Sequence, residues 1–163
     1  MTLLVKKILL VCTGNICRSP LAAALLDRAL QGRGAADIDV ASAGTGAWDG
    51  APVSEGAYLV GLERGLDLSG HRARLLTREL VDGSHLILTM ARHHRARVDE
   101  LGGEGRVFVL GEYAGREGDE VEVSDPFGGD LEVYRDTCAE LEALIEAAVE
   151  RIVKEFASGG NQR

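Results

Sequence analysis

Short apolar runs alternate with helix-forming segments along most of the 163 residues. The apolar runs, each short enough for one buried strand, are Lys6–Val11, Ile38–Ala43, His85–Met90 and Arg106–Leu110. The helix-forming segments cover residues 21–31, 53–64, 77–81, 91–101 and 131–156. This order predicts a single α/β domain with three layers, in which a four-stranded, mostly parallel twisted sheet carries helices on both faces.

The chain length suits one domain, which we assign to residues 1–157, followed by a disordered tail over 158–163. Apolar residues make up 45% and charged residues 27%, which excludes a disordered or collagen-like chain. No apolar run reaches the ~20 residues that a membrane helix needs, and the N-terminus does not resemble a signal peptide. We therefore expect a cytoplasmic protein that does not bind membranes.

Three cysteines are too few, and odd in number, for a disulfide framework, so a special cysteine would serve chemistry rather than structure. The net charge of −8 and the 4% aromatic content argue against nucleic-acid binding. The four histidines show no metal-ligand spacing, so we expect neither a metal nor another cofactor. His93 and His94 begin a polar helix and are predicted to face solvent.

The segment between the first predicted strand and the first predicted helix, CTGNICRSP, carries the chemistry. In parallel sheets, ligands bind beyond the carboxyl ends of the strands, where this segment lies. Its backbone N–H groups lack ladder partners and the helix dipole adds positive charge, so the loop can bind an anion. Gly14 and Asn15 tolerate the left-handed angles that curl such a loop. Ser19 is a favoured N-cap and Pro20 a favoured first helical residue, so we expect Ser19 to cap the helix that begins there.

Cys12 and Arg18 stand at the two ends of this loop. The helix terminus and the guanidinium favour a thiolate at Cys12, and Arg18 can hold two phosphate oxygens in bidentate fashion. A thiolate facing a bound phosphorus atom is a nucleophile for phosphoryl transfer. Ser19 can donate a hydrogen bond to that thiolate. The alternative is a buried structural thiol, because a cysteine and an arginine can also occur at this spacing by chance.

The segment VCTGNICRSP resembles the phosphate-binding loop of the low-molecular-weight protein tyrosine phosphatases, and the resemblance extends from Lys6 to Phe156. It implies an enzyme that hydrolyses phosphotyrosine in phosphorylated proteins through a cysteinyl-phosphate intermediate, without a metal. The resemblance makes Cys12 the nucleophile and Arg18 the residue that stabilises the phosphoryl oxygens. The remaining residues of the implied phosphate-binding loop are Thr13, Gly14, Asn15, Ile16, Cys17 and Ser19.

The resemblance also assigns residues outside this loop. Asp125, in the string DPFG, matches the general acid that protonates the leaving oxygen and then activates water. An Asx turn before proline would explain the same aspartate structurally. Ser42 and His71 match residues that support the loop. Trp48 and Phe127 match the walls of a substrate cleft, although a loop tryptophan can also cover the edge of a core.

The two other cysteines receive different interpretations. The resemblance implies a reversible disulfide between Cys12 and Cys17 that protects the nucleophile from over-oxidation. An inert loop thiol at Cys17 is the alternative. Cys138 falls on the apolar stripe of the last predicted helix and is expected to lie in the core. We expect the protein to be a monomer or a weak dimer.

Thr13 and the string DPFGG are similar to the bacterial branch of the family, which also includes protein arginine phosphatases. In those enzymes a threonine typically occupies the position of Ile16, and its hydroxyl helps to orient the phosphoguanidinium. Isoleucine is the usual tyrosine-phosphatase residue, so phosphotyrosine is the leading substrate and phosphoarginine the alternative. An arsenate reductase would need further cysteines between Cys17 and Cys138. A non-catalytic phosphate-binding module would lack the nucleophile, the arginine or the acid.

Overall fold

The computed structural model describes residues 5–35 and 37–157, so the predicted tail over 158–163 lies outside the described residues. The elements up to residue 82 are β1 (Lys6–Cys12), α1 (Arg18–Gly32), β2 (Ile38–Gly44), α2 (Glu55–Glu63) and α3 (Arg78–Asp82). The later elements are β3 (Leu86–Thr89), α4 (Arg92–Glu100), β4 (Val107–Val109), α5 (Leu110–Tyr113), the 3₁₀ turn η1 (Gly118–Val121), α6 (Leu131–Ile152) and the π-helical turn η2 (Val153–Ala157).

The four strands form one sheet in the order β2-β1-β3-β4, and every neighbouring pair is parallel. The predicted α/β architecture is therefore confirmed. The register pairs Cys12 at the end of β1 with Gly44 at the end of β2. Val11 pairs in the same way with Thr89 at the end of β3. Because the strands are parallel, the loops that follow them gather at one edge of the sheet, where ligands bind in folds of this kind.

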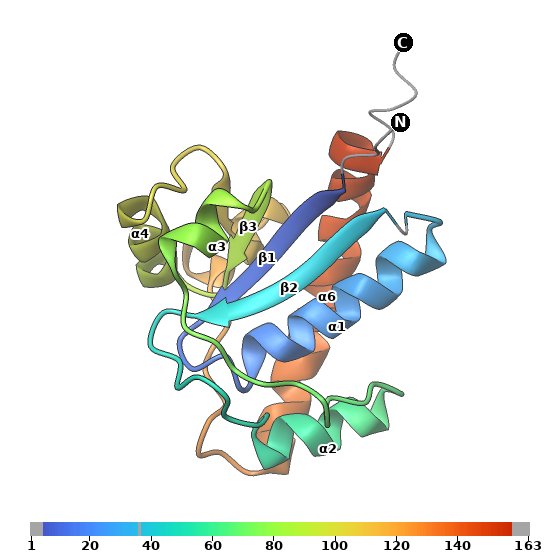
Figure 1. Cartoon of the computed structure of the whole chain (residues 1–163). Helices are drawn as coiled ribbons and strands as arrows, with labels where there is room; N and C mark the ends of the chain where they lie inside the picture. The colour runs from blue at the N-terminus through green and yellow to red at the C-terminus, as the bar shows by residue number, and fades with distance from the viewer. Residues whose placement is uncertain (1–4, 36, 158–163) are drawn as a thin grey trace.

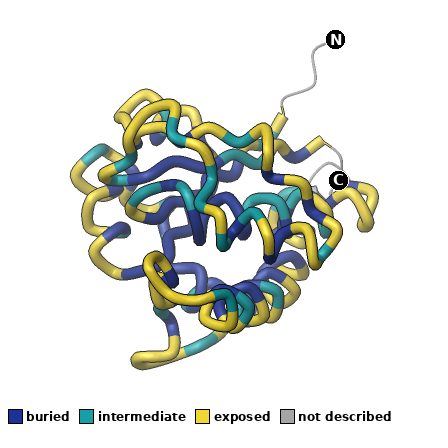
Figure 2. The backbone as a smooth tube through the Cα atoms, turned by 90° about the horizontal axis from the view of Figure 1, so that it is seen from below, coloured by how far each residue is buried: buried dark blue, intermediate teal, exposed yellow. Residues whose placement is uncertain are grey.

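Helices cover both faces of this sheet (Figure 1), and the side chains of β1 alternate between two apolar clusters. Ile8, Leu10 and Cys12 lie in the cluster with α1, α2 and α6, whereas Leu9 and Val11 pack with residues of α3 and α4. Burial on both faces explains the continuous apolar run of this strand. Figure 2 shows the same arrangement as buried backbone inside a shell of exposed segments.

The C-terminal helix confirms its predicted apolar stripe, and Cys138 is fully buried within it. None of the helices in the described parts of the chain has both the length and the apolar character needed to cross a bilayer.

The segment after β4 is more ordered than the sequence predicted. Residues 111–124 were expected to form an acidic loop, but they include most of α5 and all of η1. Leu110, assigned to the strand, instead begins α5. Leu110, Tyr113 and Val121 are buried, so apolar anchors hold this acidic segment against the domain.

The start of α1 also differs from the prediction that Ser19 caps it. The helix begins at Arg18 with Cys17 at the cap position, and no side chain caps it. The hydroxyl of Ser19 bonds instead to Cys12 and Asn15, inside the loop. The local preference of serine for a cap is thus overridden by tertiary contacts.

Candidate active site

The loop between β1 and α1 turns at Asn15, which has a φ of 59°. It is the one non-glycine residue with a positive φ in the described parts of the chain. Asparagine tolerates this left-handed conformation better than most residues. Gly14, for which a left-handed backbone was also expected, does not adopt one. The curl of the loop therefore depends on Asn15 rather than on Gly14.

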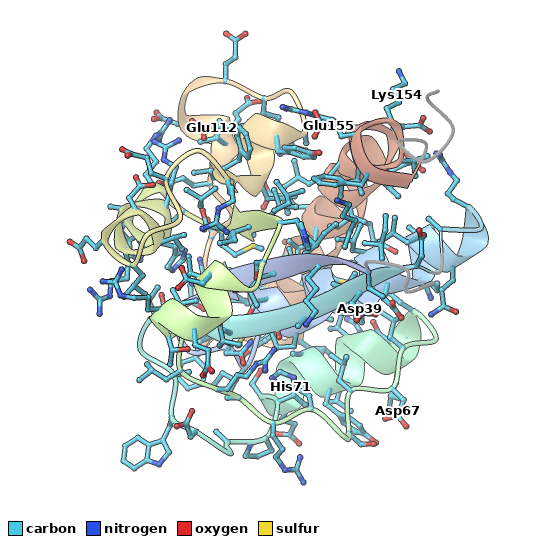
Figure 3. The ribbon with its side chains drawn as sticks, turned by 45° about the horizontal axis from the view of Figure 1, so that its top comes forward. Asp39, Asp67, His71, Glu112, Lys154 and Glu155 are labelled. Carbon is cyan, nitrogen blue, oxygen red and sulfur yellow. The ribbon has the colours of Figure 1, made fainter. Side chains whose placement is uncertain are left out.

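The buried Asn15 side chain ties the loop to the structure behind it. Its Nδ2 donates to Ser19 Oγ at 2.8 Å and to Ser42 Oγ at 2.9 Å, while Oδ1 accepts from the backbone N–H of Arg74 at 3.0 Å. The Asn15 carbonyl oxygen lies 2.7 Å from Nε2 of His71, which projects from the connection between α2 and α3 (Figure 3). Ser42 and His71 thus both contact Asn15.

Replacing Asn15 with alanine is expected to lower the free energy of unfolding by about 2–4 kcal/mol. The change leaves Ser42 Oγ and the N–H of Arg74 without their present partner, and it places an ordinary side chain in the left-handed region. Urea unfolding measures the effect. As a control, Gln31→Ala removes an exposed amide and should change the value by less than about 0.5 kcal/mol. A loss below about 1 kcal/mol in Asn15→Ala would contradict a supporting role for this network.

Gly44 contributes to the loop although the sequence did not single it out as a site residue. A Cβ built on Gly44 would lie 2.4 Å from the carbonyl oxygen of Thr13 and 3.0 Å from the backbone nitrogen of Asn15. Just beyond it, the N–H of Thr45 donates to the Cys12 carbonyl and the N–H of Gly46 to the Thr13 carbonyl, both at 2.9 Å. Only the pairing of β1 with β2 shows why this position must be glycine.

Cys12 is the last residue of β1 and is only 2% exposed. Its Sγ accepts from the backbone N–H of Asn15 at 3.3 Å and lies 3.0 Å from Ser19 Oγ. Because Ser19 Oγ already accepts from the Asn15 amide, its own hydrogen is available to the sulfur. Two donors thus converge on Cys12 and stabilise the negative charge that a thiolate nucleophile carries.

Arg18 is the first residue of α1 and is only 4% exposed. Its Nη1 donates to the carbonyl of Val123 at 2.9 Å, and its Nη2 lies 3.6 Å from Oδ2 of Asp125. Within the described parts of the chain, its buried Nε has no hydrogen-bond partner. An unpaired buried donor is costly, and an oxyanion bound in the loop would satisfy it.

Asp125 makes the Asx turn that the sequence allowed, and its role as general acid stays a prediction. Its Oδ1 accepts from the backbone N–H of Phe127 at 3.1 Å, which is the Asx turn, while Oδ2 faces Arg18. The carboxylate is half-exposed. Its segment is anchored to the sheet by Val123, whose N–H donates to the carbonyl of Met90 just after β3. One oxygen therefore shapes the turn and the other faces the loop.

These groups face one cavity of about 220 Å³ at the carboxyl edge of the sheet. It is lined by Cys12, Thr13, Gly14, Ile16, Cys17, Arg18, Asp125 and Phe127. A sulfur nucleophile, a guanidinium and a carboxyl group can here act on the same small anion. Among residues 5–35 and 37–157, no cluster of three or more His, Cys, Asp or Glu side chains is arranged to hold a metal ion.

The sequence model of the low molecular weight phosphotyrosine protein phosphatases matches residues 7–158. The chain belongs to this family. Its relatives include the probable low molecular weight protein-tyrosine-phosphatase EpsP of Ralstonia solanacearum, which is 38% identical over 91% of this chain and 97% of its own length. A protein-arginine-phosphatase from Geobacillus stearothermophilus is 39% identical over the same shares. The relatives thus include both branches named from the sequence.

Solved structures show the same two branches. The low molecular weight protein tyrosine phosphatase from T. tengcongensis superposes with a TM-score of 0.82 and 38% identity, covering 90% of this phosphatase and 99% of that chain. The YwlE arginine phosphatase from Geobacillus stearothermophilus superposes with a TM-score of 0.83 and 36% identity, covering 94% and 97%. The fold therefore does not distinguish the two activities.

Cys17 of the phosphatase lines the cavity beside Cys12, and all three cysteines are free thiols. Its Sγ lies 3.1 Å from Ser54 Oγ and 3.5 Å from the hydroxyl of Tyr134. Burial raises the pKa of the Cys17 thiol, and these two hydrogen bonds offset only part of that effect. The reversible disulfide between Cys12 and Cys17 stays a prediction.

The two aromatic residues expected to wall the cleft are placed differently. Phe127 lines the cavity of the phosphatase and is 65% exposed, so its ring is accessible to a substrate. Trp48 is 83% exposed and is not among the lining residues. In this structure the apolar surface of the cavity comes from Phe127 and Ile16.

The prediction that both His93 and His94 face solvent is wrong for one of them. His93 is exposed, but His94 is fully buried, and its Nε2 lies 2.8 Å from Oγ1 of Thr13 in the phosphate-binding loop. The polar composition of α4 concealed this contact, because only one residue in each turn of the helix faces inward there. The signal that distinguishes His94 from His93 is its spacing of three residues from Ala91 and four from Val98, both of which are buried on the same face.

Proposed function

We propose that this phosphatase hydrolyses phosphotyrosine in phosphorylated proteins through a cysteinyl-phosphate intermediate. The observation that carries the proposal is that the sulfur of Cys12, the unpaired Nε of Arg18 and the carboxyl group of Asp125 meet at one cavity. The loop and the N-terminus of α1 add positive potential for the phosphate.

In the first step the Cys12 thiolate attacks phosphorus. A P–S bond forms, the bond from phosphorus to the tyrosine oxygen breaks, and Asp125 gives its proton to that oxygen. Arg18 and the N–H groups of the loop stabilise the charge on the other phosphoryl oxygens. Oδ2 of Asp125 lies 3.6 Å from Nη2 of Arg18, so this carboxyl group is close to the phosphoryl group that the guanidinium would hold.

In the second step Asp125, now a carboxylate, takes a proton from water. The water oxygen attacks phosphorus, the P–S bond breaks, and Cys12 leaves as a thiolate together with inorganic phosphate. Ser19 and the N–H of Asn15 stabilise that thiolate as leaving group. Neither step needs an oxidant or a reductant.

The walls of the cavity support an aryl group on the substrate. Ile16 and Phe127 present apolar surface to the space above Cys12, and a phenyl ring packs well on such walls. A phosphoguanidinium carries several N–H donors that need acceptors, and the Ile16 side chain offers none. Phosphotyrosine therefore fits these walls better.

Phosphoarginine is the second candidate because a protein-arginine-phosphatase is 39% identical to this chain, as close as the tyrosine phosphatase relatives. Asp125, which lines the cavity, would also be an acceptor for a guanidinium group. The substrate therefore has to be decided by direct comparison.

A pair of peptides of one sequence, carrying either phosphotyrosine or phosphoarginine, tests the choice. We expect the wild type to favour phosphotyrosine by at least about tenfold in kcat/KM, because one unsatisfied buried donor costs about that much. Ile16→Thr should narrow the ratio by adding a hydroxyl, whereas Ile16→Val, which keeps an apolar wall, should preserve it. Preference of the wild type for phosphoarginine would reverse the ranking.

We further propose that the enzyme is cytoplasmic and acts as a monomer or a weak dimer. Three free thiols suit a reducing compartment. Cys12, Arg18 and Asp125, the three groups that the proposed steps use, all face the cavity of a single chain.

A further inference from the structure

His94 is a buried imidazole that the reaction described above does not use. It lies on α4, its residue exposure is 0%, and its Nε2 is 2.8 Å from Oγ1 of Thr13. Its other ring nitrogen, Nδ1, is buried without a hydrogen-bond partner in the described parts of the chain. Buried polar groups without partners are rare, and they recur at functional sites.

The unpaired Nδ1 indicates how the hydrogen bond to Thr13 is oriented. If Nδ1 carried the ring hydrogen, a buried N–H donor would be left without an acceptor. With the hydrogen on Nε2, the imidazole donates to Thr13 Oγ1 and Nδ1 keeps only a lone pair, which is the less costly state. Burial, reinforced by His93 and Arg18, lowers the pKa of His94 to about 3, so the ring stays neutral near pH 7 and carries a single N–H.

Thr13 is held through its side chain and through its backbone. Its Oγ1 lies 2.8 Å from Nε2 of His94 on α4. Its carbonyl oxygen accepts from the N–H of Gly46 at 2.9 Å. Thr13 follows Cys12 directly and lines the cavity, so its position affects both the nucleophile and the first N–H of the phosphate-binding loop.

We propose that His94 is a positioning residue of the active site, which holds Thr13 and thereby aligns Cys12 and the start of the phosphate-binding loop with the phosphoryl group. The proposal rests on the phosphatase chemistry proposed above. It connects α4 to that chemistry through one hydrogen bond. Because the alignment matters more in the transition state than in the substrate complex, its loss should lower kcat and leave KM nearly unchanged.

Three variants test this role with an aryl phosphate as substrate. Thr13→Val removes the hydroxyl at a residue that is exposed, so it should fold normally, and His94→Phe removes both ring nitrogens. Each is expected to lower kcat about 3- to 10-fold, the effect of one hydrogen bond. The double variant should lose no more kcat than either single variant, because the two changes remove the same interaction.

Two further variants separate positioning from a general structural effect. His94→Gln, whose amide can still donate, should recover most of the kcat that His94→Phe loses. The matched control His93→Gln makes the same change at the exposed neighbour, and its kcat should stay within about twofold of the wild-type value. The double variant should also have a Tm no lower than the wild type, since apolar groups replace the buried, half-satisfied ring of His94 and the hydroxyl of the exposed Thr13.

Several results would overturn the role. Wild-type kcat in Thr13→Val would do so, even if His94→Phe failed to fold. Losses that multiply in the double variant, or failure of His94→Gln to restore kcat, would also contradict it.

An inactive wild type would contradict the proposed function instead. Calorimetric binding of vanadate, which mimics the transition state without turnover, would then decide: we expect the Kd to rise about 3- to 10-fold in Thr13→Val, and an unchanged Kd would end the proposal.

Discussion

Replacing Cys12 with serine is expected to lower kcat on an aryl phosphate by about four to six orders of magnitude. A serine hydroxyl is not ionised at neutral pH, and the two donors that converge on this position stabilise a thiolate rather than supply a base. Initial rates with p-nitrophenyl phosphate measure the loss. Because the guanidinium and the loop N–H groups are unchanged, inorganic phosphate should still bind, which calorimetry can show.

The matched control for Cys12→Ser is Cys138→Ser. Cys138 is equally inaccessible but lies in the core on α6, so its replacement should lower stability and leave kcat within about twofold. Substantial activity in Cys12→Ser would contradict a covalent cysteinyl intermediate. Loss of phosphate binding in the same variant would show that the loop had been distorted, and Asn15 would then be the residue to examine.

Replacing Asp125 with asparagine is expected to produce losses that depend on the leaving group. Asparagine keeps an oxygen that can accept from the N–H of Phe127, so the Asx turn survives while the proton donor is lost. On a phosphotyrosine peptide kcat should fall about 10²- to 10³-fold, as for the loss of a general acid. On a phosphate with a strongly acidic phenol the loss should be under about tenfold, because that leaving group departs without protonation.

Asp130→Asn controls for the change of charge near this segment. Asp130 caps α6 through the N–H of Val133, and asparagine caps helices equally well, so both substrates should keep rates within about twofold of the wild type. Equal losses on the two substrates in Asp125→Asn would exclude the acid role and leave the Asx turn as the reason for this aspartate.

Elements that depend on neighbouring residues were predicted well. The apolar run of β1, the helix-forming run of α1 and the stripe of α6 are local patterns, and each forms within a few residues of its expected bounds. The prediction that Ser19 caps α1 was wrong, because its hydroxyl forms hydrogen bonds with Cys12 and Asn15 instead. The preference of serine for the N-cap describes an isolated helix, and hydrogen bonds to residues elsewhere in the fold can override it.

Contacts between distant segments could not be predicted in this way. His93 and His94 are adjacent on one polar helix, and only His94 is buried. No residue near His94 in the sequence indicates that it contacts Thr13. The steric need for glycine at position 44 also appears only when β2 pairs with β1.

From its residues alone, this chain could be assigned an α/β domain with an anion-binding loop between the first strand and the first helix. Those properties follow from the order of apolar runs and from the residue types within one short segment. The separation of 3.6 Å between Asp125 and Arg18 and the contact between His94 and Thr13 emerged only from the three-dimensional arrangement. The parallel sheet brings the ends of β1 and β3 to one edge, and with them the loop that carries Thr13 and the helix that carries His94. The hydrogen bond from Val123 to Met90, just after β3, holds the segment of Asp125 at the same edge.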